Sequence, residues 1–399
     1  LYCMRSKVEI PGRQSAGRLA CNRLVNPESS CMESIYLDHN ATTPVDPEVA
    51  MAMRPYFGDR FGNASSVHQF GRDAKVALET AREQVAEFIN CEPSELFFTS
   101  GGTESDNIAV LGTAFQWQTK KNHIIVGSTE HHAVLEPAEW LHHKHGFAFD
   151  KLSVDREGSA SVETLKGLLT EQTCLVSVMH ANNETGTIQD LAALTAVCRE
   201  KNVLFHTDAV QSIGKIPVDV KKLGVDMLSL TGHKIYGPKG AGALFIRQGI
   251  KINPLFYGGS HEKKRRPGTE NVACIVGLAK SLEIAGKKMA DDSSRLGSLA
   301  GYFIDAVVSH IPHTSINSPK NNRIPQTVNL SFAGAEGESI VLSLDMEGIA
   351  VSSGSACTSG ANEPSHVLIA MGIDRIVAQG AVRFSLGRST PADERVRET

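Results

Sequence analysis

Lys234 ends the segment SLTGHK (229–234), directly after a short apolar run and before the glycine-rich turn YGPKG (236–240). Asp208 stands at the end of an earlier apolar run. One strand-helix-strand unit fits the interval between the two residues. Both side chains are therefore expected at the carboxyl edge of one sheet, where ligands bind in open α/β folds. A surface ion pair would give the same local pattern, so the two segments alone leave both interpretations open.

A lysine and a carboxylate at one sheet edge are what pyridoxal 5'-phosphate (PLP) chemistry requires. The lysine amine holds the cofactor aldehyde as a Schiff base, and the carboxylate keeps the pyridine nitrogen protonated so that the ring can accept electrons. Lys234 and Asp208 would supply these two groups. The pair thus predicts PLP as the cofactor.

The loop TSGGTES (99–105) joins an apolar run to a helical segment and contains Gly102 and Thr103. Its exposed backbone N–H groups and hydroxyls would suit a phosphate at a helix N-terminus. Turns of this kind also simply begin helices, so the motif by itself does not decide between a phosphate cradle and a helix start.

His131 follows another apolar run, in the segment EHHA (130–133), and would emerge at the same sheet edge. Its imidazole could stack on the PLP ring. The chain has 15 histidines, but those of the region 131–145 have no cysteine or carboxylate set at ligand spacing beside them. We therefore predict no metal site.

Cys357 lies in the segment VSSGSACTSG (351–360), which is small, polar and rich in glycine. Such a loop favours an exposed thiol that can move to a substrate and present its product elsewhere. An unreactive loop cysteine is the alternative. The other seven cysteines form no CxxC pair, and we interpret them as reduced thiols without a chemical role.

Arg383 alternates with apolar neighbours in the segment VRFS (382–385). In a strand this alternation would point Arg383 away from the face that holds Val382 and Phe384. A guanidinium fixed in this way can bind a substrate carboxylate through two hydrogen bonds. An ion pair between two domains would explain the same segment.

The elements that must position these residues alternate between helix and strand. Apolar residues at helical spacing predict a helix from Phe70 to Asn90. Short apolar runs after it predict strands at Leu96–Thr99, Ile124–Ser128, Leu175–Met179, Val203–His206, Met227–Leu230 and Ala243–Ile246. Helices predicted near Asp106–Gln118, Leu135–His145 and Ala192–Lys201 separate most of these runs. This order indicates a mostly parallel sheet covered on both faces.

The pattern changes from about Leu296 onward, where a helix, a strand at Thr327–Phe332 and a helix at Glu338–Asp345 predict a second, α+β domain. Residues 1–31 show no hydrophobic periodicity, and we predict a disordered or non-native extension. Their arginines suggest an organelle transit segment as the alternative, but Glu9, Glu28 and the missing amphipathic pattern argue against it.

The composition is that of a globular protein. With 399 residues and 41% hydrophobic residues, the chain can form a core large enough for two domains. The formal net charge of -4, with lysine and arginine spread along the chain, argues against a nucleic-acid partner. No apolar run approaches the roughly 20 residues that span a bilayer. We therefore expect a cytoplasmic protein without a membrane partner.

Taken together, the motifs resemble those of the cysteine desulfurases of the nitrogen-fixation and iron-sulfur-cluster type (group I), which are fold-type I PLP enzymes. The similarity runs from YLDHNATTP (36–44) to RFSLGR (383–388). Within it the motifs HANNETG (180–186), TGHK (231–234), RRPGTEN (265–271) and SSGSACTSG (352–360) occur in the family's order.

The resemblance implies roles for particular residues. Lys234, Cys357 and His131 would be catalytic, with Lys234 as the Schiff-base lysine, Cys357 as the sulfur acceptor and His131 stacked on the ring. Further cofactor-binding residues would be Gly102, Thr103, Asn183, Asp208, Gln211, Thr231, His233 and Thr269, where Gln211 donates to the ring hydroxyl and Thr269 reaches the phosphate of a neighbouring subunit. The substrate would contact Arg383, Asn40 and Asn183, with Arg383 on its carboxylate.

The resemblance also implies a fold and a reaction. The fold would be a large PLP-binding domain (residues 46–289) with a mostly parallel seven-stranded sheet, and a smaller α+β domain (32–45 and 290–399) that carries the Cys357 loop. A homodimer would convert L-cysteine to alanine and pass a persulfide from Cys357 to an iron-sulfur scaffold or another sulfur acceptor. The family pattern also predicts a further helix after Gly387-Arg388, close to where this sequence stops. A selenocysteine lyase, a PLP aminotransferase and a non-catalytic binding subunit are the alternatives.

Overall fold

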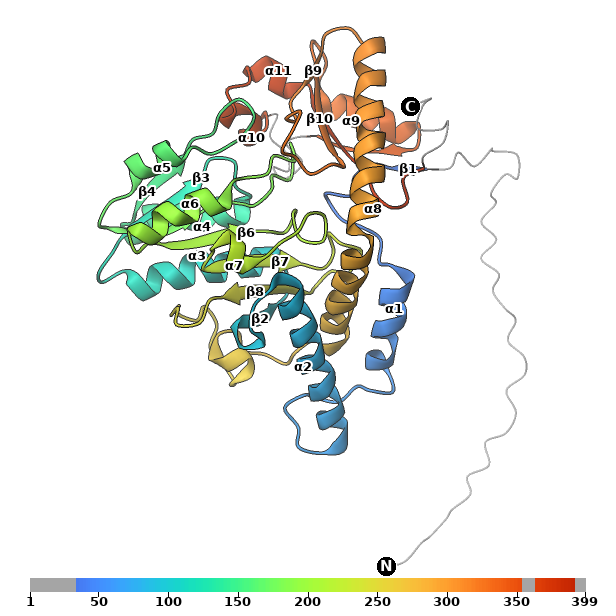
Figure 1. Cartoon of the computed structure of the whole chain (residues 1–399). Helices are drawn as coiled ribbons and strands as arrows, with labels where there is room; N and C mark the ends of the chain where they lie inside the picture. Colours follow the sequence, from blue (N-terminus) through green and yellow to red (C-terminus); the bar gives the residue numbers. More distant parts are fainter. Residues whose placement is uncertain (1–33, 354–362, 392–399) are drawn as a thin grey trace, which may run out of the picture. The chain divides into compact units, whose positions relative to one another are not determined.

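The computed structural model describes residues 34–353 and 363–391 (Figure 1). The predictions for the extension at residues 1–31 and for Cys357 lie outside the described residues. Contacts between Cα atoms place Ser34–Thr399 in one compact unit. In the described part of the chain, every helix is too short or too polar to cross a lipid bilayer.

A seven-stranded sheet forms the centre of this unit. Its strands, in spatial order, are β2 (Leu96–Thr99), β8 (Gly242–Ile246), β7 (Met227–Thr231), β6 (Leu204–Asp208), β5 (Thr173–Ser177), β3 (His123–Gly127) and β4 (Ala148–Leu152). The pairs from β7 to β4 are parallel, whereas β8 runs antiparallel to both of its neighbours. The prediction of a mostly parallel seven-stranded sheet in an α/β fold is therefore confirmed.

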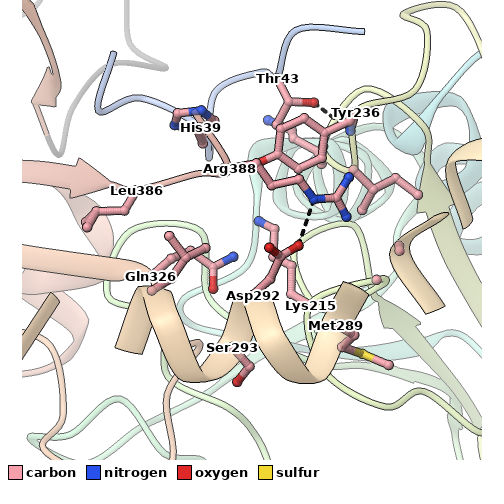
Figure 2. A pocket seen from close by; sticks show the side chains of 15 residues that line it. His39, Thr43, Lys215, Tyr236, Met289, Asp292, Ser293, Gln326, Leu386 and Arg388 are labelled. Carbon is pink, nitrogen blue, oxygen red and sulfur yellow. Dashed lines mark hydrogen bonds and ion pairs between the residues drawn. The ribbon is translucent and has the colours of Figure 1, made fainter. Parts of the chain in front are cut away.

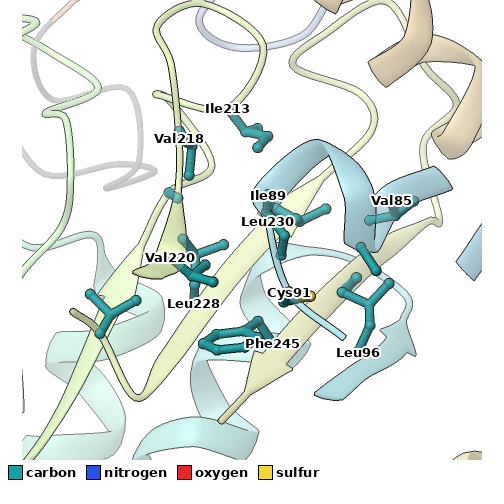
Figure 3. Packing of buried hydrophobic residues seen from close by; sticks show 14 of the residues in the cluster. Val85, Ile89, Cys91, Leu96, Ile213, Val218, Val220, Leu228, Leu230 and Phe245 are labelled. Atoms are coloured by element: carbon teal, nitrogen blue, oxygen red, sulfur yellow. The ribbon is translucent and has the colours of Figure 1, made fainter. Parts of the chain in front are cut away.

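Both faces of this sheet are buried, which explains why its strands read as continuous apolar runs. Successive residues point to opposite faces. Leu228 and Leu230 pack into one cluster with α2 (Gln69–Ile89), α6 (Leu191–Glu200) and α8 (Val272–His310), part of which Figure 3 shows. Met227, the residue before Leu228, packs on the other face with α3 (Gly102–Trp117) and α4 (His132–His145).

Most predicted elements lie within two residues of the observed ones, but α4 begins three residues before the predicted Leu135, and α3 and β4 also differ. Helix α3 begins four residues before the predicted Asp106, because the small residues of the GGT turn already belong to its first turn. Strand β4 was not predicted. It lies at the edge of the sheet and most of its residues are exposed or half-buried, so its sequence AFDKL contains no continuous apolar run.

Two smaller sheets accompany the second half of the chain. One contains β12 (Ser352–Ser353), β13 (Ala381–Ser385), β10 (Thr327–Phe332) and β9 (Thr314–Ile316), and the other pairs β1 (Ile35–Tyr36) with β11 (Ile349–Ala350). Leu330 and Phe384 of the four-stranded sheet pack against Phe303 of α8 and half-buried residues of α9 (Gly337–Met346). The shorter helices are α1 (Pro47–Met53), α5 (Val162–Leu168), α7 (Val220–Leu223), α10 (His366–Ala370) and α11 (Arg375–Gln379).

Helix α8 is a single helix of 39 residues. The predicted domain boundary at residues 289–290 lies inside it. The helix contributes Leu278 and Leu282 to the core of the seven-stranded sheet, and Leu296 and Phe303 to the core of the smaller sheets (Figure 1). The division into a large and a small domain stays a prediction, and α8 is the element that would join them.

Candidate active site

A cavity of about 340 Å³ lies at the carboxyl edge of the seven-stranded sheet. The residues predicted from the sequence that line it are Asn40, Gly102, Thr103, His131, Asn183, Asp208, Gln211, Thr231, His233, Lys234 and Arg383. They come from segments that are far apart in the chain and meet only in the folded structure. Of the other predicted site residues, Thr269 does not line this cavity and Cys357 lies outside the described residues.

Lys234 and Asp208 reach this cavity from two adjacent parallel strands. Asp208 is the last residue of β6, and Lys234 follows the end of β7 by three residues. The Nζ atom of Lys234 donates hydrogen bonds to the carbonyl oxygens of Asn40, at 2.6 Å, and Ala41, at 2.7 Å. These carbonyls hold the amine at the cavity wall.

The Asp208 carboxyl group is buried, and burial raises its pKa to about 6. A hydrogen bond from the backbone N–H of Val210 and the nearby Lys234 amine act in the opposite direction. Asp208 is therefore mostly an anion at neutral pH. Two further buried acids, Asp106 and Glu130, have pKa values well above the ordinary range because of burial and the nearby Asp208 charge. Asp208 is thus the group of the three that carries the negative charge.

His131 is the N-cap residue of α4, where its Nδ1 atom accepts a hydrogen bond from the backbone N–H of Ala133 at 3.1 Å. Burial lowers the pKa of His131 to about 4, and the positive charge of Lys234 contributes in the same direction. The imidazole is therefore neutral at physiological pH. A neutral ring can stack on another ring and can accept a proton.

The N-terminus of α3 faces the same cavity. The first N–H groups of a helix have no partner within the helix, so the start of α3 can bind an anion at Gly102 and Thr103. A Cβ atom at Gly102 would lie 2.6 Å from Val210 Cγ2, so only glycine allows this close approach. The side chains of Thr231 and His233 line the same cavity. Burial lowers the pKa of His233 to about 4, so its ring is neutral.

Arg383 extends from β13 to the cavity on the side of the smaller sheet. Its NH2 group pairs with Asp38 Oδ1 at 2.8 Å, and NH1 donates to the carbonyl oxygen of Asn183 at 3.1 Å. The Nε atom is buried and has no hydrogen-bond partner among the described residues. The side chain of Asn40 donates to the same Asn183 carbonyl, at 3.2 Å, and to Thr327 Oγ1, at 2.9 Å. A fixed guanidinium therefore lies close to the predicted cofactor site, and its buried Nε–H group has no partner among the described residues.

Thr269 is exposed and lies in a neighbouring, more open cavity of about 900 Å³. This second cavity shares Thr103 with the first. Arg266, near Thr269 in the chain, pairs with Glu104 in the first turn of α3 at 2.7 Å. Thr269 therefore lies outside the first cavity, in a second cavity that meets it at Thr103.

The sequence did not point to several residues that line the cavity, namely Ala41, Asp106, Met179, Val210 and Ser352. Asp106 looked like an ordinary helix residue, since nothing local shows that α3 points it toward the charge of Asp208. Met179 and Val210 follow the ends of β5 and β6, so their position after an apolar run was the available signal.

Comparison with known proteins identifies the family of the chain. The class-V aminotransferase family matches residues 35–395. A cysteine desulfurase IscS of Dictyoglomus turgidum is 51% identical over 90% of this chain and 91% of that protein. The solved structure of a NifS-like protein matches with a TM-score of 0.86 and 39% identity, covering 92% of this chain and 96% of that one. A structure described as SspA in complex with cysteine matches with a TM-score of 0.79 and 35% identity over 88% and 99% of the two chains. The chain therefore belongs to the class-V aminotransferase family, and within it to the cysteine desulfurases of the nitrogen-fixation and iron-sulfur-cluster type.

Proposed function

We propose that this protein is a PLP-dependent cysteine desulfurase, which takes the sulfur from L-cysteine, releases L-alanine and holds the sulfur as a persulfide on Cys357. The observation that carries the proposal is that Lys234, Asp208, His131 and Arg383 line one cavity. It is supported by the family to which the chain belongs and by relatives that bear the name cysteine desulfurase.

The residues of the cavity fit PLP by their chemistry. Lys234 offers an amine for the aldehyde, Asp208 a carboxylate for the ring nitrogen, and the start of α3 a phosphate site. Thr231 and His233 would complete the phosphate site, His131 would stack on the ring, and Gln211 would donate to the ring oxygen. When bound, PLP supplies an electron-accepting ring that makes bonds at the amino acid's carbon atoms easier to break.

Lys234 and His131 are the groups that would move protons. The amine of Lys234 is directed by the carbonyls of Asn40 and Ala41, which keep it at the cavity wall. His131 is neutral at physiological pH because burial lowers its pKa to about 4, so it can accept a proton from the substrate thiol. A base that was already protonated could not do this.

Arg383 would bind the carboxylate of L-cysteine. Its guanidinium is fixed by Asp38 and by the Asn183 carbonyl, and its buried Nε has no partner among the described residues. A buried donor without a partner is costly, and a substrate carboxylate would supply the missing acceptor. We infer that Asn40 and Asn183 position this arginine and border the substrate.

Cys357 would be the sulfur acceptor. Ser352 lines the cavity, and Cys357 follows it by five residues, a length of chain that spans at most about 18 Å when extended. In the overall step the Cys357 thiolate forms an S–S bond to the substrate sulfur while the substrate C–S bond breaks. The carbon takes up a proton and leaves as alanine, so that the enzyme gains one sulfur atom.

The proposal includes a cytoplasmic homodimer that delivers sulfur to an iron-sulfur scaffold or another acceptor. Thr269 supports the dimer because it is exposed and lies outside the cavity of its own chain. A second copy would be needed to bring this hydroxyl to a phosphate. The relatives that bear the name cysteine desulfurase support a role in sulfur transfer, and the protein acceptor is part of the proposal.

The test is mass spectrometry of the PLP-loaded protein after incubation with L-cysteine. We expect one added sulfur on the peptide that contains Cys357, together with alanine in the solution. Cys357→Ala should keep the yellow absorbance of PLP and lose the added sulfur, whereas Lys234→Ala should lose the absorbance. Full sulfur release by Cys357→Ala with free cysteine would show that the acceptor is assigned wrongly.

The same incubation separates the alternatives. A PLP aminotransferase would release a keto acid in place of alanine. A selenocysteine lyase would release alanine from L-selenocysteine and not from L-cysteine. A non-catalytic binding subunit would show no PLP absorbance after loading.

A further inference from the structure

Lys215 lies behind the active site, four residues after Gln211. Its Nζ atom is 2.7 Å from Gln211 Oε1 and 3.1 Å from Asn40 Oδ1. Gln211 and Asn40 line the active-site cavity, whereas Lys215 lines a separate, small cavity of about 30 Å³ (Figure 2). Lys215 thus supports two active-site side chains from the rear.

The chain fixes this lysine through a tight turn after β6. The backbone N–H of Lys215 donates to the carbonyl of Ser212 at 3.1 Å, and Gly214 adopts a φ of +68°. A Cβ atom at Gly214 would lie 2.9 Å from Ile235 Cγ2 and 3.0 Å from Ala285 Cβ. Both the left-handed backbone and the lack of space require glycine, so the turn that directs Lys215 is held between the turn after β7 and helix α8.

Hydrogen bonds from Lys215 fix which way its amide partners face. The Nζ atom of Lys215 donates to the side-chain oxygens of Gln211 and Asn40, so these oxygens point toward Lys215. Their NH2 groups then point away from it. Gln211 Nε2 donates one hydrogen to the carbonyl of Asn40 at 3.0 Å, and no hydrogen bond of the described residues uses its second hydrogen. This second donor is available to the active-site cavity.

Lys215 has no ordinary structural reason to be where it is. Among the described residues it forms no ion pair, and the positive charges that act on it, Lys234 and Arg383, lower its pKa together with burial. Asp292 lines the small cavity but is paired with Arg388 Nε at 2.7 Å (Figure 2). His39 and Tyr236 complete the titratable groups of that cavity. A half-buried positive charge close to other positive charges costs free energy. No ion pair among the described residues offsets this cost, so ion pairing does not explain why a lysine stands at position 215.

We propose that Lys215 is a positioning residue that locks the Gln211 amide with its NH2 group toward the active site, as donor to the ring oxygen of bound PLP. The inference rests on the proposed function, because it assumes that PLP occupies the cavity. The position of Lys215 behind Gln211, with no contact to the active-site cavity itself, makes its role indirect.

The role has a spectroscopic consequence. A donor to the ring oxygen stabilises the negative charge that this oxygen carries when the bound cofactor loses its proton. The pH midpoint at which the absorbance of bound PLP changes is therefore lower while Gln211 donates a hydrogen bond to the ring oxygen. Without Lys215 the amide can turn its oxygen toward the ring, and the midpoint should rise by about one pH unit, the order of one hydrogen bond to a charged group.

The experiment is a pH titration of the absorbance of the PLP-loaded protein for wild type and Lys215→Met, together with the affinity of each apoprotein for PLP. We expect the midpoint to rise by about one unit and PLP binding to weaken about tenfold in the variant. Lys215→Arg keeps the donors and the charge, so it should restore most of both values. Lys239→Met, which removes an exposed lysine near His233, is the matched control and should titrate like wild type.

The Gln211→Leu background shows whether Lys215 acts through the amide. If it does, Lys215→Met adds no further shift to Gln211→Leu. Equal shifts in both backgrounds would indicate a pure charge effect and would overturn the proposal, as would an unchanged midpoint in the single variant. If Lys215→Met does not fold, Lys215→Gln decides in its place, because it can donate but does not dictate the amide orientation. A wild-type protein without PLP absorbance would refute the proposed function, which is a separate outcome.

Discussion

The active site depends on side chains whose charge state is set by burial. Asp208 stays an anion at neutral pH although burial raises its pKa to about 6, and His131 stays neutral because burial lowers its pKa to about 4. Lys234 lies near both and disfavours protonation of each. The same cavity therefore contains a neutral base, His131, and a negative charge, Asp208.

Arg383 gives the first prediction at this scale. Arg383→Lys replaces a planar fork of donors by a single point charge, which cannot keep Asp38 and Asn183 and also bind a carboxylate. We expect the KM for L-cysteine to rise about 10- to 100-fold while PLP absorbance is retained. Steady-state alanine release measures this. Arg323→Lys, next to the same sheet but outside the cavity, is the control, and an unchanged KM for Arg383→Lys would contradict the assigned role.

Glu184 gives a prediction about pH. It is buried and accepts a hydrogen bond from Ser365 Oγ at 2.5 Å, and burial raises its pKa to about 7 from an ordinary 4.5. The native state therefore binds this proton more tightly than the unfolded state does. The contribution of protonated Glu184 to the free energy of unfolding is therefore complete below about pH 4.5 and is lost as the pH rises to about 7.

Glu184→Gln removes this titration, so the variant should become more stable than wild type as the pH rises from 5 to 8, by up to about 3 kcal/mol. Urea unfolding of both proteins at the two pH values measures the difference. Glu163→Gln changes an exposed glutamate and should differ from wild type by the same amount at both pH values. Parallel pH curves for Glu184→Gln and wild type would rule out the raised pKa.

At the scale of elements, two parallel strand ends and one helix start build the site together. β6 supplies Asp208, the turn after β7 supplies Lys234, and α3 supplies the proposed phosphate cradle. The antiparallel strand β8 supports this arrangement from the side, because it lies between β7 and β2 and its first residue is packed against the loop before α3. The close packing of β8 is therefore part of what holds the cradle in place.

Gly242, the first residue of β8, tests this packing. A Cβ atom there would lie 2.6 Å from Gly101 Cα and 2.7 Å from the carbonyl oxygen of Leu230. Gly242→Ala must therefore displace the backbone of the cradle, and we expect a loss of about 1–3 kcal/mol in unfolding free energy together with weaker PLP binding. Urea unfolding and a PLP titration measure the two effects.

Gly167→Ala in α5 is the matched control, because a Cβ atom there meets nothing within 4 Å. It should stabilise the helix by about 0.5–1 kcal/mol and leave PLP binding unchanged. If Gly242→Ala changes the unfolding free energy and PLP binding no more than Gly167→Ala does, the close packing of β8 on the loop before α3 does not require glycine at position 242.

At the scale of the whole molecule, the described residues form several hydrophobic clusters, and the long helix α8 contributes to more than one of them. The seven-stranded sheet has a core on each face, and the smaller sheets have a core of their own. α8 enters the first core through Leu278 and the third through Phe303. Because Arg383 lies in the four-stranded sheet and Lys234 follows a strand of the seven-stranded sheet, the relative position of these cores determines the width of the active-site cavity.

Ala290 lies on the exposed side of α8 between these two groups of contacts. Ala290→Pro removes a helix hydrogen bond and should cost about 3 kcal/mol or more, whereas Ala290→Gly should cost about 1 kcal/mol. If α8 joins two domains, the proline variant should unfold in two thermal steps and the glycine variant in one. Calorimetry distinguishes these results, and a single step for the proline variant would argue that the cores unfold as one unit.

Much of the fold was predictable because its information is local. Continuous apolar runs predicted the buried strands β2 and β7, and helical spacing predicted α2, since these patterns follow from which faces are buried. The residues that follow the strand ends were predictable as site candidates for the same reason, because the carboxyl ends of parallel strands meet at one edge. Strand β4, which buries little, gave no comparable signal.

The tertiary structure decided what depends on distance between remote segments. It places Arg383 beside Asn40 and Asn183, leaves Thr269 outside the cavity, sets Lys215 behind Gln211 and continues α8 across the predicted domain boundary. None of these follows from periodicity, because periodicity states which face of an element is buried and not which other element covers it. The sequence alone therefore determined the chemical groups and the elements that carry them, whereas packing decided which of those groups touch.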